Sequence, residues 1–337
     1  MVWKLTPEFE NIFERAFTRI KQARRVLVLG HRNPDGDALS SVAAMLVFLD
    51  ELGLQSYAYC ADKNKNNFDF LPRGERINNS FPEGVSPADF DLIIVLDCGS
   101  LSRTALAEEI KAAQDKGAEV IEFDHHPKVD DYSDIEIRMD DKASTTEILF
   151  NFFKYNGWPV SKDLANCLLT GILTDTANFL YPSTSSQTID ISSELLAAGA
   201  RFPKIMQNTW QNKNLASMKI WGLALSRLKI NQRYNLAVAV ITQEDLSSLD
   251  LGDDGKDEIN DISSEIAGFL SGLNDVRAVV DAAALHHRPR PGAGAHLRPG
   301  AGRVRLQLRG HVLGQRHAAA RLRVEAHLGR LLGGAVA

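Results

Sequence analysis

The residues of this chain that could do chemistry begin with one histidine and two aspartates within seven positions. His31, Asp35 and Asp37 come directly after the apolar run at residues 26–30. Such a run is typical of a buried parallel strand, and open α/β sheets place their ligand sites beyond the carboxyl ends of such strands. A tight turn there lets the first two side chains face one point and the third a neighbouring one. The segment therefore predicts a site for two metal ions, with a loop that caps the following helix as the alternative.

Three later segments supply more side chains of the same kinds. Two of them again follow apolar runs, at residues 93–96 and 120–123, and the third lies near the end of a helix expected over 164–174. Adjacent side chains point in different directions, so one of two neighbouring histidines can bind a metal while the other faces a substrate. An aspartate beside them can hold a histidine tautomer. The side chains that these segments add are Asp97, Asp124, His125, His126 and Asp175.

Six of these side chains form a ligand set without a thiolate. Its carboxylate share favours Mn²⁺ or Mg²⁺ over structural zinc. Two ions about 3.5 to 4 Å apart activate a water and stabilise both oxygens of a phosphoryl displacement. No phosphate loop ending in Lys and Ser or Thr occurs, and no acyl-transfer nucleophile elbow, so the set predicts hydrolysis of a phosphate ester or anhydride. The six are His31, Asp35, Asp37, Asp97, His125 and Asp175.

The elements that must position these groups alternate between strands and helices. Strands are expected over 26–30, 55–60, 93–96 and 120–123. Helices are expected over 7–22, 39–52, 105–116, 145–156 and 164–174. Residues 185–227 should be helical with a break near 199–203, followed by strands at 236–241 and 276–282 around a helix over 257–273. We therefore expect an α/β fold: a parallel sheet with helices on both faces, a helical linker and a smaller α/β domain.

Composition is that of a globular protein, with 44% hydrophobic and 24% charged residues in 337 positions, which is long enough for two domains. The three cysteines show no CxxC spacing, which argues against a disulfide framework and a thiolate zinc site and fits a reducing cytoplasm. The first residues lack a basic stretch followed by an apolar one, and no segment reaches the roughly 18 apolar residues that span a bilayer. We expect a cytoplasmic protein, neither secreted nor inserted in a membrane.

Charge is divided unevenly along the chain. Residues 283–337 hold ten arginines, one glutamate and six of the nine histidines, which gives +9 and leaves −14 for residues 1–282. The same tract lacks Lys, Asp, Ser, Thr, Asn, Ile and aromatic residues. Two interpretations stay open: a basic tail that binds nucleic acid, and an out-of-frame reading of GC-rich coding sequence, which the composition favours. Residues 304–308 are compatible with a strand in either case.

The four segments together resemble the ordered motifs of the DHH phosphoesterase superfamily. The match covers the first 190 residues, and the strand and helix after residue 231 resemble the beginning of the family's companion domain, DHHA1. The resemblance implies two metal sites that share one bridging carboxylate, with His126 as the catalytic imidazole and Asp124 beside it. The first implied site comprises His31, Asp35 and Asp97, and the second comprises Asp37, Asp97, His125 and Asp175.

Within the superfamily, the size of the chain and its Pro-Asp-Gly-Asp sequence resemble the NrnA-type branch. That branch degrades short oligoribonucleotides and dephosphorylates 3′-phosphoadenosine 5′-phosphate, so short RNA or a small nucleotide is the implied substrate. The cofactor we expect from the ligand set is two Mn²⁺ ions, with Mg²⁺ as the alternative. A homodimer stays open. The domains implied are a DHH domain over 1–190, a helical linker over 191–230, the start of a DHHA1-like domain over 231–282 and an atypical tail over 283–337.

Other functions stay open because the same site cleaves other phosphodiesters, the family's Gly-Gly-Gly-His substrate motif is absent, and no substrate-binding residue is assigned. One alternative is a phosphodiesterase for cyclic or linear dinucleotides. A pyrophosphatase-like hydrolase is another, although the Ser-Arg-Lys-Lys-Gln segment of those enzymes is also absent. The third is a metal-binding pseudoenzyme, disabled by an incomplete C-terminal domain.

Overall fold

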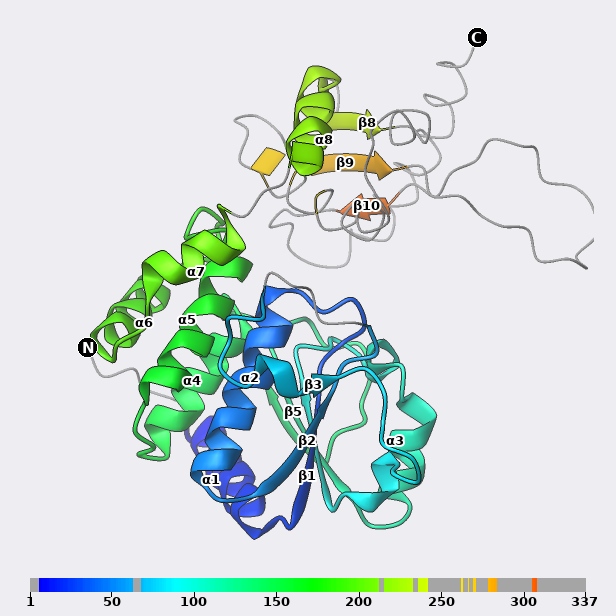
Figure 1. Cartoon of the computed structure of the whole chain (residues 1–337), viewed down its shortest axis with the longest axis vertical. Helices are drawn as coiled ribbons and strands as arrows, with labels where there is room; N and C mark the ends of the chain where they lie inside the picture. The colour runs from blue at the N-terminus through cyan, green and yellow to red at the C-terminus, as the bar shows by residue number, and fades with distance from the viewer. Residues whose placement is uncertain are drawn as a thin grey trace, which may run out of the picture. The chain divides into compact units, whose positions relative to one another are not determined.

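The computed structural model describes residues 6–62, 68–211, 215–232 and 236–241, and further along residues 262, 266, 269–270, 278–283 and 305–307. The chain divides into two compact units, Met1–Asn212 and Lys213–Ala337. Each unit has a sheet of its own, and Figure 1 shows both. The boundaries expected from the sequence, with a linker over 191–230, stay a prediction.

The sheet of the first unit has six strands, all parallel, in the order β3-β2-β1-β4-β5-β6. The chain runs from β1 outward to β3 and then returns to the other side of β1, so the strand order reverses between β1 and β4. The strands are β1 (Arg25–Leu29), β2 (Gln55–Tyr59), β3 (Ile77–Asn78), β4 (Leu92–Leu96), β5 (Glu119–Asp124) and β6 (Ile135–Arg138). The four strands expected here are confirmed within one residue at each end. The sequence does not predict β3 and β6, because two and four residues are too short for a periodic signal.

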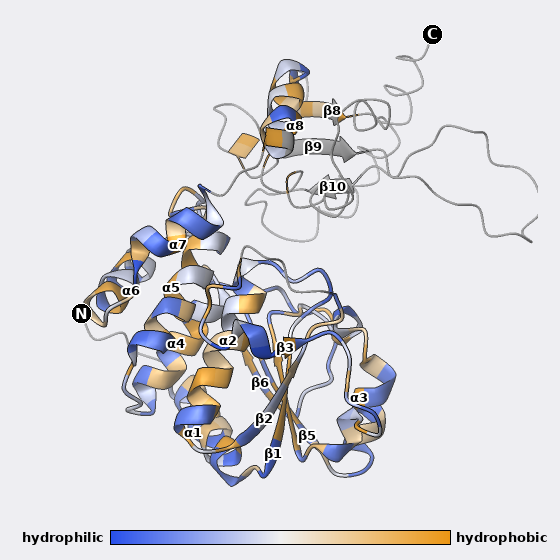
Figure 2. Ribbon diagram, viewed as in Figure 1, coloured by the Kyte–Doolittle hydropathy of each residue, from blue (hydrophilic) through white to orange (hydrophobic). Residues whose placement is uncertain are grey.

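Helices cover both faces of this sheet, which confirms the predicted fold class. One face carries α1 (Pro7–Gln22), α2 (Gly36–Glu51), α4 (Thr145–Tyr155) and α5 (Lys162–Asp175), and the other carries α3 (Ala107–Gln114) with the 3₁₀ helix η4 (Leu101–Thr104). Side chains of β1 alternate between these layers: Val26 and Val28 belong to the first core, Leu27 and Leu29 to the second. Figure 2 shows the hydrophobic colour concentrated on the strands between the helices.

Helix α2 packs against α4 and α5 and is buried along nearly its whole length. It begins at Gly36, earlier than the expected residue 39, because the Asp35 carboxylate accepts a hydrogen bond from the Ala38 N–H and caps the helix. The tight turn expected after His31 therefore ends at Asp35, and Asp37 lies in the first turn of α2. A β carbon at Gly36 would lie 2.5 Å from the Thr174 side chain of α5, so glycine permits this close crossing.

Two more helices complete the first unit, α6 (Ser186–Ala197) and α7 (Phe202–Thr209). The break expected near 199–203 is confirmed and lies at Gly199, whose φ of 101° is left-handed. The expected continuous helix from this break to about residue 225 is wrong, since α7 ends before α8 (Leu215–Ser226) begins. The sequence between them is rich in Asn and Gln, and Asn has low helix propensity.

The second unit contains α8 and a four-stranded sheet in the order β10-β9-β8-β7. Its strands are β7 (Lys229–Asn231), β8 (Leu236–Ile241), β9 (Ala278–Ala283) and β10 (Arg305–Gln307). Strand β8 has the bounds expected from the sequence, and β9 begins two residues later than expected. Most of the helix expected over 257–273 and of the tail over 283–337 lies outside the described residues.

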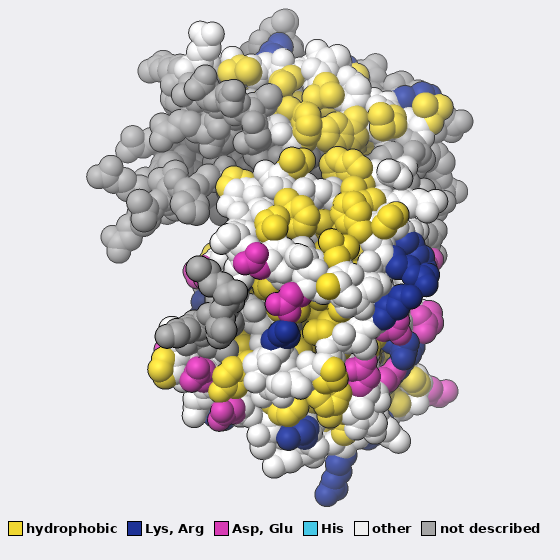
Figure 3. All heavy atoms as spheres, turned by 90° about the vertical axis from the view of Figure 1, so that its left-hand side faces the viewer, with side chains coloured by type: hydrophobic (Ala, Val, Ile, Leu, Met, Phe, Trp, Pro, Cys, Tyr) yellow, Lys and Arg dark blue, Asp and Glu magenta, His cyan; other side chains and the backbone are white. Residues whose placement is uncertain are grey.

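The helical side of the molecule presents a mixed surface. Figure 3 shows Lys and Arg side chains beside Asp and Glu side chains along one edge of this face, and no described histidine on it. Helices α4 and α6 are joined by an ion pair between Lys154 and Glu194 (2.7 Å). Among the helices of the described ranges, none has the length and apolar character of a membrane span.

The largest core depends on the ring of Phe152 in α4, which is fully buried. Its edge-to-face contacts with Phe13, Phe48 and Phe123 join α1, α2 and β5. We expect Phe152→Ala to lower the free energy of unfolding by about 3 to 5 kcal/mol, because it leaves a cavity between three elements. Urea unfolding of the full chain, followed by circular dichroism, measures this. The matched control is Phe202→Ala on α7, where the ring is 38% exposed and a clearly smaller loss is expected; equal losses would contradict the prediction.

Candidate metal centre

The ends of three neighbouring strands bring the predicted site residues to one edge of the sheet. The His31–Asp37 segment follows β1, Asp97 follows β4, and His125 and His126 follow β5. Helix α5 contributes Asp175 as its last residue. Because β1 and β4 flank the reversal of strand order, these loops stand where open α/β sheets bind their ligands.

His31 has the tautomer and the surroundings of a metal ligand. Its Nδ1 lies 2.8 Å from the Arg32 carbonyl oxygen, which can only accept, so Nδ1 is the donor and Nε2 carries the lone pair of the neutral ring. The side chain is 3% exposed, and among the described residues Nε2 has no hydrogen-bond partner. Nε2 faces carboxylate oxygens of Asp35 at 3.9 Å and Asp97 at 3.8 Å. A buried lone pair between two carboxylates fits a cation.

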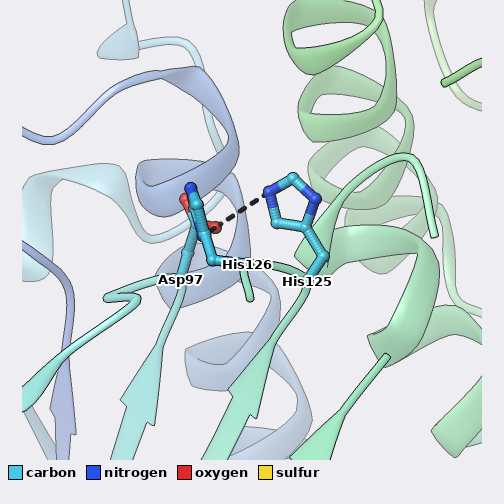
Figure 4. Close-up of side chains that lie close together, drawn as sticks. All are labelled: Asp97, His125 and His126. Atoms are coloured by element: carbon cyan, nitrogen blue, oxygen red, sulfur yellow. Dashed lines mark ion pairs between the residues drawn. The ribbon is translucent and has the colours of Figure 1, made fainter. Parts of the chain in front are cut away.

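Asp97 faces both halves of the site. One oxygen, Oδ2, faces His31, and the other, Oδ1, lies 3.4 Å from Nε2 of His125 and accepts a hydrogen bond from the Thr145 hydroxyl (2.9 Å). Figure 4 shows the Asp97 carboxylate directed toward the His125 ring. The backbone is left-handed, with a φ of 59°, a conformation that costs a non-glycine residue about 1 to 3 kcal/mol and persists where the surroundings hold it.

A second group lies beside the first. Ligand atoms of Asp37, His125 and Asp175 lie within 4.8 Å of one another, as do those of His31, Asp35 and Asp97. His125 Nε2 is 3.5 Å from Asp175 Oδ2. The structure thus brings all six predicted ligands together, and Asp97 also forms a third group with His125 and His126. Their role as ligands stays a prediction.

Electrostatics of the site also fit a cation. Burial and the charges of Asp37 and Asp35 raise the pKa of Asp97 well above its ordinary range. Burial likewise raises the pKa of Asp37, although hydrogen bonds oppose it. For His125, burial lowers the pKa but the charges of Asp175 and Asp37 outweigh it, and the net shift is upward. Carboxylates gathered this closely need positive charge between them to remain ionised.

The N-terminus of α4 holds Asp37 in place. The Thr145 N–H donates to Oδ2 (2.7 Å), and Thr146 donates to Oδ1 from its N–H (3.2 Å) and its hydroxyl (2.8 Å). Ser144 caps α4, since its side chain accepts a hydrogen bond from the Glu147 N–H. The contacts of Thr145 and Thr146 with the carboxylates are a function that the sequence does not reveal, because α4 and α2 meet only in the fold.

Glycine on α5 makes room for this contact. A β carbon at Gly171 would lie 2.4 Å from the Thr146 side chain and 2.5 Å from Asp37 Oδ1. Any larger residue at this position would push the carboxylate out of place. The positions of Asp37 and Thr146 thus depend on the close approach of α5.

His126 differs from the other two histidines in its exposure and in its partner. Its N–H and Nδ1 both lie within hydrogen-bond distance of Asp124 Oδ1, at 2.8 and 2.9 Å. Asp124 Oδ2 accepts from the Gly99 N–H (2.5 Å). Burial raises the pKa of Asp124, but the hydrogen bonds and charge of His126 outweigh it, and the net shift is downward. Nδ1 is the His126 nitrogen 3.5 Å from Asp97, and its bond to Asp124 makes it a poor ligand.

An arginine that the sequence analysis does not single out holds the loop that carries His126. Arg138 of β6 is 8% exposed and donates to the His126 carbonyl oxygen (2.6 Å). It pairs with the buried Glu122 of β5 and lies 3.5 Å from Asp124 Oδ2. No sequence signal identifies Arg138, because β6 itself is too short to predict.

Comparisons with known proteins agree with this geometry. Residues 25–172 match the DHH family, N-terminal domain. A probable bifunctional oligoribonuclease and PAP phosphatase NrnA of Streptococcus mutans is 30% identical over 242 residues, covering 67% of this chain and 74% of that protein. The bifunctional oligoribonuclease and PAP phosphatase NrnA of Bacillus subtilis is 25% identical over 260 residues, 76% of each chain. The crystal structure of an exopolyphosphatase-related protein from Bacteroides fragilis shares the fold, with a TM-score of 0.74, 22% identity and coverage of 84% and 82%.

Fold and site together define a metal-dependent hydrolase of phosphate esters, with its chemistry at the carboxyl edge of a parallel sheet. The chain belongs to the DHH family of phosphoesterases.

Removal of the Thr146 hydroxyl tests how far the Asp37 carboxylate depends on α4. We expect Thr146→Val to weaken Mn²⁺ binding about 10- to 100-fold, because groups that orient a metal ligand typically contribute that much. Titration calorimetry of the full chain measures it. Thr170→Val is the matched control, since Thr170 is equally buried but its hydroxyl donates only to the Asn166 carbonyl oxygen. Equal affinities for the two variants would contradict the role given to Thr146.

Proposed function

We propose that this protein is a two-metal phosphoesterase that hydrolyses short oligoribonucleotides and 3′-phosphoadenosine 5′-phosphate. The observation that carries the proposal is that two ligand groups lie side by side, with Asp97 Oδ1 of one group 3.4 Å from His125 Nε2 of the other. The names of the two NrnA relatives, each an oligoribonuclease and PAP phosphatase, support the substrate class. Both substrates present a phosphate ester on a ribose, which is the kind of bond that two-metal sites cleave.

The ions would be held by the six side chains described above. His31, Asp35 and Asp97 would hold the first, and the second would be held by Asp37, His125 and Asp175 with Asp97 between them. Mn²⁺ is the ion we propose, with Mg²⁺ as the alternative, because the set combines four carboxylates with two imidazoles. When bound, the ions supply Lewis acidity toward the phosphate and lower the pKa of a water.

His126 would donate the proton, with Asp124 as its hydrogen-bond partner. Asp124 accepts the hydrogen bond from Nδ1, so it stabilises the imidazolium and leaves Nε2 as the nitrogen that can donate. With 37% of its side chain exposed, His126 is accessible to a substrate, whereas His31 is not. We propose that Nε2 of His126 protonates the leaving ribose oxygen or positions the phosphate.

Contacts that select the substrate are proposed for the second unit, as part of a DHHA1-like domain over 231–282. The Gly-Gly-Gly-His motif that would supply them is absent from the sequence, and most of residues 283–337 lies outside the described part of the chain. A dinucleotide phosphodiesterase, a pyrophosphatase-like hydrolase and a pseudoenzyme therefore remain the alternatives that experiment must separate.

Two substitutions separate the ligands from the proposed proton donor. We expect Asp97→Asn to lose both bound Mn²⁺ and activity, because it removes charge where the two groups meet. His126→Ala should keep the Mn²⁺ content of the wild type and lose about 100- to 10,000-fold in kcat, as removal of a general acid does. Metal analysis of the purified chain together with hydrolysis of 3′-phosphoadenosine 5′-phosphate measures both. Equal loss of metal in the two variants would overturn the role of His126.

A substrate panel tests the class of reaction. We expect the Mn²⁺-loaded chain to hydrolyse RNA dinucleotides and 3′-phosphoadenosine 5′-phosphate faster than pyrophosphate and long single strands. Cyclic dinucleotides and the activated ester bis-p-nitrophenyl phosphate complete the panel. Turnover of pyrophosphate far above that of dinucleotides would move the protein to the pyrophosphatase-like class, and cleavage of the activated ester alone would indicate that substrate capture is lost.

A further inference from the structure

The side chains of Arg103 and His126 both approach Gly99. Glycine at position 99 allows this, because a β carbon there would lie 3.2 Å from Arg103 Nη1 and 3.6 Å from both Cβ and Cγ of His126. The guanidinium and the imidazole therefore approach the same point of the backbone, two residues after Asp97. Glycine also suits the left-handed φ of 66° at this position.

The backbone around Arg103 is fixed from both sides. Its carbonyl oxygen accepts a hydrogen bond from the Arg32 N–H (2.8 Å), which ties η4 to the loop that carries His31. At the start of η4, the Leu101 N–H donates to Asp130 Oδ2 (3.1 Å), and at its end Thr104 is fully buried. The base of the Arg103 side chain is thus held between the loops that follow β1 and β5.

The guanidinium itself has no anionic partner within the described ranges. No hydrogen bond or ion pair of the half-buried Arg103 side chain is found there, whereas Arg138, the other arginine close to His126, is paired with Glu122. Asp124 pairs with Arg138 instead (3.5 Å), and it accepts hydrogen bonds from His126 and Gly99. A half-buried guanidinium without a carboxylate is a site for an anion that comes from outside the chain.

We propose that Arg103 binds the phosphate group of the nucleotide on the His126 side of the metal centre. This inference rests on the proposed function and adds a substrate contact made by the first unit itself. The phosphate is the chemical class that fits, because the guanidinium offers a planar fork of N–H donors to its oxygens. It also supplies the positive charge that a polyanionic substrate needs beside five aspartates.

The test is the affinity of the full-length, Mn²⁺-loaded chain for AMP, the nucleotide common to the products of the proposed reactions. We expect Arg103→Gln to weaken AMP binding about 10- to 100-fold, the usual contribution of a hydrogen bond to a charged group. Arg103→Lys should show an intermediate affinity, because it keeps the charge but loses the fork. Titration calorimetry measures both, with Mn²⁺ stoichiometry and melting temperature expected to match the wild type.

Two controls separate a local contact from a general effect of charge. Arg24→Gln removes the same charge from an exposed position at the amino end of β1, away from the site, and should leave AMP affinity unchanged. Adenosine, which lacks the phosphate, should bind the wild type and Arg103→Gln equally. Equal loss in Arg24→Gln and Arg103→Gln would reduce the effect to net charge and overturn the proposal.

Failure of this inference is distinguishable from failure of the proposed function. If the wild type hydrolyses 3′-phosphoadenosine 5′-phosphate and Arg103→Gln binds AMP as tightly as the wild type, Arg103 has no phosphate contact and the proposed function stands. If the wild type neither binds AMP nor hydrolyses any nucleotide of the panel, both proposals are wrong.

Discussion

Five aspartates gather at one edge of the sheet of the first unit, and their mutual repulsion is the constraint on which the site depends. Burial of Asp97 removes the water that would otherwise screen it from the others, and burial together with the charges of Asp37 and Asp35 raises its pKa well above the ordinary range. The chain offsets part of this charge with the N–H groups and hydroxyls of Thr145 and Thr146 at the N-terminus of α4, where the helix dipole also favours an anion. The rest of the negative charge has no partner among these groups. It lies beside the imidazoles of His31 and His125, which can offer lone pairs, and such surroundings suit a divalent cation.

Close packing makes this arrangement rigid. Helices α2 and α5 cross at Gly36 and Gly171, and a β carbon at either position would come within 2.5 Å of a neighbouring side chain. Because α5 packs this closely against Asp37, its last residue, Asp175, lies opposite His125. Metal sites tolerate little error in ligand position, and at these two glycines the close contact offsets the weakening that glycine brings to a helix.

The positions of the charged groups determine which proposed role we give to each unit. The first unit contains every group that we assign to the metal ions and to the proton, and with Arg103 it also contains a cation for the substrate. The second unit contributes a sheet of four strands in which β8 and β9 are parallel. The substrate-selecting contacts that we propose for residues 231–282 belong to this unit.

The sequence by itself predicted the class of the fold, which the structure confirms, and the side chains of the candidate site, whose role as ligands stays a prediction. Apolar runs followed by His, Asp or Asp-His-His indicated parallel strands with candidate ligands at their ends. A strand buried on both faces is apolar throughout, and the polar residues of a site follow directly after it, so both signals are local in the sequence. Only the tertiary structure decided which side chains meet: that Asp37 lies at the N-terminus of α4, that Arg138 of the short β6 holds the His126 loop, and that Arg103 approaches His126 over Gly99. These contacts join segments far apart in the chain, and spacing along a sequence carries no record of distance in space.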